Sequence, residues 1–173
     1  MSLRRNHGFT ELRNYGETER RKLGETEKLL TTNITNYTKK LMIVDRELIE
    51  KLFEQAKGNP RKRVNYDMRT SPEDGSQRML NAMLPGTEVA VHRHPNSNEN
   101  VILIIGKMYE ILYEVADGQL VETERLYLCP AEGKYGCQVP KGVWHTVEVV
   151  EPSVLYEAKD GKYGEDGSET YEG

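Results

Sequence analysis

The feature that most constrains the fold is a series of short runs rich in Val, Ile, Leu and Tyr between about residues 64 and 160, with no helical pattern between them. Turn residues separate the runs, among them Pro85-Gly86, Gly106, Asp117-Gly118 and Pro152. β-branched and aromatic residues favour strands, and closely spaced turns favour antiparallel neighbours. The pattern therefore predicts an all-β sandwich or barrel of the jelly-roll kind.

One helix is expected before the strands, over residues 45–57. Apolar residues from Leu48 to Ala56 recur there at helical spacing, Asp45 is a suitable N-cap, and Gly58 is a suitable stop. We expect this helix to pack on the outside of the β structure.

Residues 1–41 differ from the rest of the chain in charge and composition. They hold nine Lys or Arg against five Asp or Glu, whereas residues 42–173 hold fifteen against twenty-three. Their sparse apolar residues cannot offset the entropy of ordering, so we expect a disordered basic extension or a non-native segment upstream of a start at Met42. Residues 42–163 then form a single domain, and residues 164–173 form a flexible, exposed acidic tail.

The composition also argues against several classes of partner. The acidic domain disfavours nucleic acid as a ligand. No apolar run is long enough for a membrane span or a secretory signal, so we expect a cytoplasmic protein with no membrane partner. Cys129 and Cys137 match neither a redox nor a zinc motif, and we interpret them as reduced and partly buried.

The histidines are distributed unevenly. The chain has four, and His92 and His94 stand one residue apart in the segment HRHPNSNE, which ends at Glu99. Alternate residues of a strand share a face, so both imidazoles can reach one ion, and a hairpin return can bring the Glu99 carboxylate beside them. His145, after the turn of PKGVWH, offers a third imidazole. Imidazoles and a carboxylate on one face are typical of a site for a first-row divalent metal.

Polar residues near the first strands are candidates for ligand binding. Arg61, Arg63, Asn65 and Arg78 cluster before and within these strands, and a guanidinium aimed into a pocket recognises carboxylate or phosphate. We take Arg63, Asn65 and Arg78 as the candidate substrate-binding residues, with a solvated basic edge as the alternative. No catalytic residue is assigned.

Two further groups of charged residues have plainer interpretations. In YEILYE, Tyr109 and Glu110 lie on opposite faces of the expected strand, which we interpret as core against solvent. Glu157 and Lys159 flank the last strand and are expected to form a cross-strand ion pair.

These residues carry a family resemblance. Gly86 to Gly106 reads Gly, five residues, His, one residue, His, four residues, Glu, six residues, Gly, which resembles the first cupin motif, and PKGVWH resembles the centre of the second. Over roughly Met42 to Tyr163 the chain resembles the WbuC-type cupin fold metalloproteins, which are found beside bacterial surface-polysaccharide (O-antigen) genes. The resembling segments include RKRVNYDMRTSPEDGSQRMLNAMLPGT and LYEAKDGKY.

The resemblance implies a conical cupin barrel with a metal in its mouth, bound by His92, His94, Glu99 and His145. The ion would be Zn, Fe, Mn, Ni or Co, and the barrel could pair as a homodimer through its sheet edges. Three functions stay open at this point. They are a metal-dependent isomerase, epimerase or lyase acting on a small anionic or sugar-like substrate, an iron-dependent dioxygenase, and a non-catalytic metal-stabilised module that binds a sugar or acid.

Overall fold

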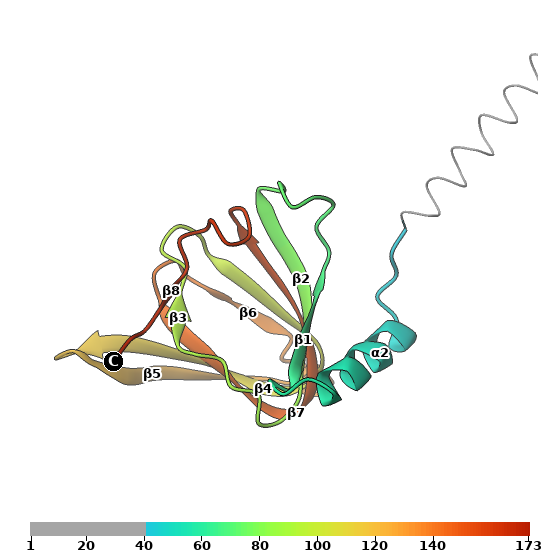
Figure 1. The fold of residues 1–173 in the computed structure, drawn as a ribbon. Helices are drawn as coiled ribbons and strands as arrows, with labels where there is room; N and C mark the ends of the chain where they lie inside the picture. The colour runs from blue at the N-terminus through green and yellow to red at the C-terminus, as the bar shows by residue number, and fades with distance from the viewer. Residues whose placement is uncertain (1–40) are drawn as a thin grey trace, which may run out of the picture. The chain divides into compact units, whose positions relative to one another are not determined.

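The computed structural model describes residues 41–173, so the predicted extension over residues 1–41 lies almost entirely outside the described part. Within it, α2 (Arg46–Lys57) precedes the eight strands of one antiparallel sheet, which curves round into a barrel (Figure 1). The strands are β1 (Arg63–Asp67), β2 (Ser76–Met83), β3 (His92–Arg93), β4 (Glu99–Ala116), β5 (Gln119–Leu128), β6 (Gly136–Val139), β7 (Trp144–Asp160) and β8 (Glu169–Thr170), with the short 3-10 helix η1 (Pro130–Glu132) before β6. The all-β prediction is confirmed. No helix in residues 41–173 is long and apolar enough to cross a membrane.

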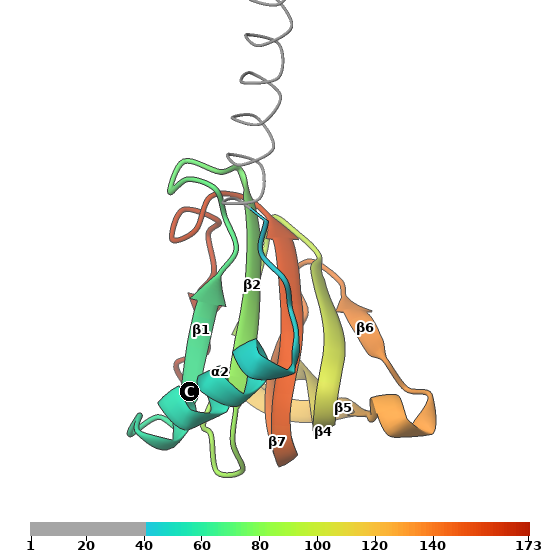
Figure 2. The ribbon, with the colours of Figure 1, turned by 90° about the vertical axis from the view of Figure 1, so that its right-hand side faces the viewer.

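The predicted N-terminal helix is present as α2. The Asp45 carboxylate accepts a hydrogen bond from the backbone N–H of Leu48, 3.0 Å away, which satisfies a donor that the first helical turn leaves free. Figure 2 shows α2 lying across β1 and β2 on the outside of the barrel. Leu52 of the helix packs there with Leu80 and Ala82 of β2, which forms the outer of two apolar clusters.

The inner cluster fills part of the barrel. It contains Met83, Val101, Leu103, Met108, Leu128, Val149 and Leu155, drawn from β2, β4, β5 and β7. Alternation along each strand sends these side chains inward and leaves their neighbours outside. Three members of this cluster, Met83, Val101 and Leu155, also line a cavity, whose remaining walls carry mainly polar side chains.

Two long strands differ from the prediction. Gly106 and Pro152 were predicted to separate short strands, but β4 and β7 run through them and pair with each other along most of their length. The register between β4 and β7 shifts three times between Leu103 and Met108. Gly106, with φ 102°, lies within these shifts against Pro152 and Ser153, where a Cβ atom would clash. The glycine therefore allows a bulge within a strand, and it does not form a turn.

Candidate metal centre

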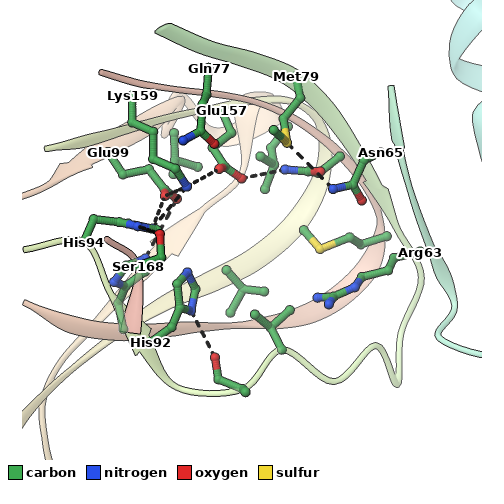
Figure 3. Close-up of a pocket in the computed structure, with 18 of the residues that line it drawn as sticks. Arg63, Asn65, Gln77, Met79, His92, His94, Glu99, Glu157, Lys159 and Ser168 are labelled. Atoms are coloured by element: carbon green, nitrogen blue, oxygen red, sulfur yellow. Dashed lines mark hydrogen bonds and ion pairs between the residues drawn. The ribbon is translucent and has the colours of Figure 1, made fainter. Parts of the chain in front are cut away.

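A cavity of about 400 Å³ opens between β1, β2, β3, β4, β7 and the C-terminal segment. His92 and His94 come from the β3 region, Glu99 begins β4, and His145 lies near the start of β7. The antiparallel pairing of β3 with β7 sets His92 directly opposite His145. Figure 3 shows His92, His94 and Glu99 on one side of the cavity, and the strand pairing brings the distant His145 beside them.

The four side chains form a compact group. One ligand atom from each, an imidazole nitrogen or a carboxylate oxygen, lies within 4.8 Å of all the others. The Nε2 atom of His94 is 2.8 Å from Glu99 Oε2, and Nε2 of His145 is 3.8 Å from Glu99 Oε1. Three of the four residues are buried, and His92 is half-buried. The group could hold a metal ion, since nitrogen and oxygen ligands of this kind suit first-row divalent metals.

Hydrogen bonds on the far side of each imidazole orient the rings. The Nδ1 atom of His92 is 3.0 Å from the carbonyl oxygen of Ala90, and that of His145 is 3.1 Å from the carbonyl of Val143. A carbonyl only accepts, so Nδ1 carries a proton in both rings and Nε2 is the nitrogen that faces the group. The Nδ1 atom of His94 is 2.7 Å from Ser168 Oγ. Outer partners of this kind accompany metal-ligating histidines.

Burial and protonation of the imidazoles fit a bound cation. Nε2 of His145 is buried and has no hydrogen-bond partner within residues 41–173, which leaves a lone pair that an ion would satisfy. Burial, and then the neighbouring His145, lower the pKa of His92 to about 4. His92 is therefore neutral at neutral pH, as metal ligation requires.

The carboxylate of the group is held in its charged form. Burial acts to raise the pKa of Glu99, but the facing His145 and His94 rings and the charge of Lys159 outweigh it and hold that pKa well below its usual value. Lys159 Nζ lies 3.2 Å from Glu99 Oε2 and also 3.2 Å from His94 Nε2. An ammonium thus contacts two of the atoms that would ligate a metal, and a bound ion would compete with it.

Lys159 also pairs with a second carboxylate, that of Glu157. Its Nζ is 2.9 Å from Glu157 Oε1, and Asn81 Nδ2 donates to the other oxygen of Glu157 at 2.7 Å. Glu157 and Lys159 were predicted to form a cross-strand pair. They instead lie two residues apart on one face of β7, pair with each other and line the cavity. The pKa of Glu157 is raised by burial and by the charge of Glu99, against the pull of Lys159.

The predicted substrate-binding residues separate into two groups. Arg63 and Asn65, alternate residues of β1, line the cavity on the wall opposite the histidines (Figure 3). Arg78 is not among the lining residues and pairs with Asp74. Alternation explains this difference, because Gln77 and the next odd-numbered residues of β2 face the cavity and Arg78 faces away.

The C-terminal segment differs in part from the prediction. Residues 164–173 were expected to be a flexible, exposed tail, and most of them are exposed, but Asp166 is only 7% exposed and β8 pairs with β3. The Asp166 carboxylate accepts hydrogen bonds from Ser168 Oγ at 2.7 Å and from Gln77 Nε2 at 3.0 Å. The segment therefore supports His94 through Ser168, which also lines the cavity. Hydrogen bonds hold this segment in place, and buried apolar side chains do not. Its short, polar sequence therefore shows no hydrophobic periodicity from which its structure could be predicted.

Comparison with known proteins places the fold. A family model described as a domain of unknown function (DUF6016) matches residues 44–126, and no curated protein matches the chain. Among solved structures, an oxalate oxidase in complex with the substrate analogue glycolate superposes with a TM-score of 0.50 at 13% identity, over 65% of this chain and 56% of that one. The described part of the chain has the cupin fold. The chain spans little more than half the length of that oxidase.

Two further structures show weaker similarity. Oxalate decarboxylase from Lactobacillus farciminis superposes with a TM-score of 0.47 at 14% identity, over 62% of this chain and 30% of that one. The capsular polysaccharide assembling protein CapF from Staphylococcus aureus superposes with a TM-score of 0.47 at 19% identity, over 63% of this chain and 29% of that one.

Proposed function

We propose that this chain is a divalent-metal-binding cupin that binds, or acts on, a small anionic or sugar-like ligand in its cavity. One observation carries the proposal. Three imidazoles and the carboxylate of Glu99 offer ligand atoms within 4.8 Å of one another, and the rings are oriented by outer hydrogen bonds. A surface cluster of acidic residues would show neither the burial nor this orientation.

The ligand set suits Zn, Fe, Mn, Ni or Co and does not choose among them. When bound, such an ion supplies a Lewis acid that can polarise a carbonyl or hydroxyl oxygen of the ligand. His92, His94, Glu99 and His145 are the residues that would hold it. Lys159, beside Glu99, would have to yield part of its contact with the carboxylate and would keep Glu157 as its partner.

The charge of the cavity supports an anionic ligand. The cavity is lined by three cations, Arg61, Arg63 and Lys159, and by four carboxyl groups, Glu99, Glu110, Glu157 and Glu169, so without a metal three positive charges stand against four negative ones. A divalent cation would make the cavity positive overall, and a guanidinium recognises a carboxylate or phosphate through paired hydrogen bonds. The cavity volume of about 400 Å³ suits a ligand no larger than a small sugar or acid.

We infer a WbuC-type kinship, and with it a link to surface-polysaccharide biosynthesis, from the sequence resemblance described above. The motifs that carry it, HRHPNSNE and GVWHTV, supply the four candidate ligands. This inference favours hydroxylated, sugar-derived ligands over purely apolar acids.

Metal analysis tests the proposal directly. Protein purified without added metal should contain one divalent ion per chain, and Glu99→Gln or His145→Ala should lose most of it. Glu157→Gln is the matched control, because Glu157 lines the same cavity but lies outside the four-residue group. Full metal content in both Glu99→Gln and His145→Ala, or none in the wild type after incubation with each candidate ion, would contradict the proposal.

A further inference from the structure

Glu110 is a buried carboxyl group that the candidate metal centre does not use. It lies in the middle of β4, lines the cavity and is only 1% exposed. The sequence pattern had placed it toward solvent. The register shifts around Gly106 reverse the alternation of β4, so that Glu99 and Val101 face inward before the bulge and Met108 and Glu110 face inward after it.

Neither carboxyl oxygen of Glu110 has a hydrogen-bond partner within the described part of the chain. A buried polar group without a partner destabilises a fold, and native proteins rarely keep one without a reason. Such a group at the wall of a cavity is suited to receive a ligand. The same features are absent from Glu114, the next acidic residue on the same strand, which is exposed.

The position of Glu110 relates it to the metal centre. Its partner across the strand pair is Val147, which also lines the cavity and lies two residues beyond His145 on β7. Two residues of a strand span roughly 6.6 Å along its axis. The distance from the Glu110 carboxyl to the histidines is therefore comparable to the length of one small ligand. One molecule can therefore contact the metal centre and Glu110 at once.

The surrounding charges restrict what Glu110 can bind. Glu99 and Glu157 share the cavity, and burial together with these two charges raises the pKa of Glu110 well above its usual value. A ligand anion placed here would be repelled by the neighbouring carboxylates. An uncharged hydroxyl group suits the site, because it both donates and accepts and can satisfy a carboxyl in either protonation form.

We propose that Glu110 is a ligand-recognition residue that hydrogen-bonds a hydroxyl group of a hydroxylated acid, while the acid's anionic end faces Arg63. Figure 3 shows Arg63 on the side of the cavity opposite His92 and His94. The inference rests on the proposed function, because it names the ligand class of the same cavity. It gives the buried Glu110 carboxyl group a role that metal binding by the other four residues does not provide.

The first test measures stability. Glu110→Met has a similar volume and no hydrogen-bonding demand, so the full-length, ligand-free variant should unfold at a higher temperature than the wild type. Glu114→Met on the same strand is the control and should change little. A lower unfolding temperature for Glu110→Met would show that the carboxyl has a structural partner and would overturn the proposal.

The second test measures recognition in the metal-loaded full chain by calorimetry. The probes are D-gluconate and hexanoate, which share chain length and a carboxylate and differ in their hydroxyl groups. The wild type and Glu114→Met should prefer gluconate, and Glu110→Met should lose about tenfold in gluconate affinity. Glu110→Gln, whose amide also donates and accepts, should stay within a few-fold of the wild type.

Equal binding of the two probes to the wild type, no binding of either, or an unchanged preference in Glu110→Met would overturn this inference. Metal content measured on the same samples separates it from the proposed function. Wild-type protein that takes up no metal contradicts the proposed function. Metal-loaded protein that does not distinguish the probes contradicts only the role of Glu110.

Discussion

Glu99 and Glu110 face the same cavity from one strand, although an odd number of positions separates them. In a regular strand such residues point to opposite faces. The register shifts between Leu103 and Met108 bring both inward, and Gly106 lies within them. The bulge therefore decides which residues of the second half of β4 reach the cavity.

Replacing Gly106 with alanine should destabilise the protein by about 2–4 kcal/mol, because the added Cβ atom would meet Ser153 and the carbonyl of Pro152 and the backbone has a positive φ. Gly118→Ala is the control. Gly118 also has a positive φ but nothing lies within 4 Å of a Cβ there, so we expect a loss of about 1–2 kcal/mol. Urea unfolding measures both, and equal losses would argue against a packed bulge.

Local patterns predicted much of this site and the bulge explains part of what they missed. The motif spacing around His92 and His145 predicted a group that the fold does bring together. Strand alternation alone predicted that Glu110 points to solvent. That prediction was wrong because the strand continues through Gly106, and the bulge there changes which alternate residues face inward. No local sequence signal distinguishes such a glycine from one that ends a strand. To predict that Arg78 points away from the cavity, one must know which alternate residues of β2 face inward. Only the pairing of β2 with β7 determines this.

Lys159→Met removes the cation that lies between Glu99 and Glu157. Without metal, the buried carboxylate of Glu99 and the half-buried carboxylate of Glu157 lose their cationic partner, and the free energy of unfolding should fall by about 3–5 kcal/mol. Lys107→Met is the control, because Lys107 pairs with the exposed Glu151, and water screens such a pair, so this variant should lose much less stability.

The same variant should respond more strongly to metal. A divalent ion replaces the missing positive charge and no longer competes with an ammonium at Glu99, so it should raise the unfolding temperature of Lys159→Met by more than that of the wild type. Thermal unfolding with and without a chelator measures the difference. An equal rise in both proteins would contradict a shared site for the ion and the ammonium.

Ser168→Ala removes the outer partner of His94 Nδ1. The ring would lose its fixed orientation, and metal affinity should fall by about tenfold to a hundredfold. Ser97→Ala is the matched control, because the Ser97 hydroxyl is buried and has no hydrogen-bond partner in residues 41–173. Competition with a chromophoric chelator measures both affinities. If the two variants bind metal alike, the C-terminal segment does not support the site in this way.

Acid should destabilise the metal-free protein through His92. The folded pKa of His92 is about 4 against an ordinary value of 6.5, so between these values the unfolded chain binds a proton that the folded chain does not. Above pH 6.5 the titration of His92 does not affect stability. Between pH 6.5 and 4 it lowers the free energy of unfolding by up to about 1.4 kcal/mol for each unit by which the pH falls. His92→Asn removes the titrating group and should flatten the dependence. Urea unfolding at pH 7 and pH 5 in the presence of a chelator compares the two proteins, and an identical loss in both would show that another group causes the acid sensitivity.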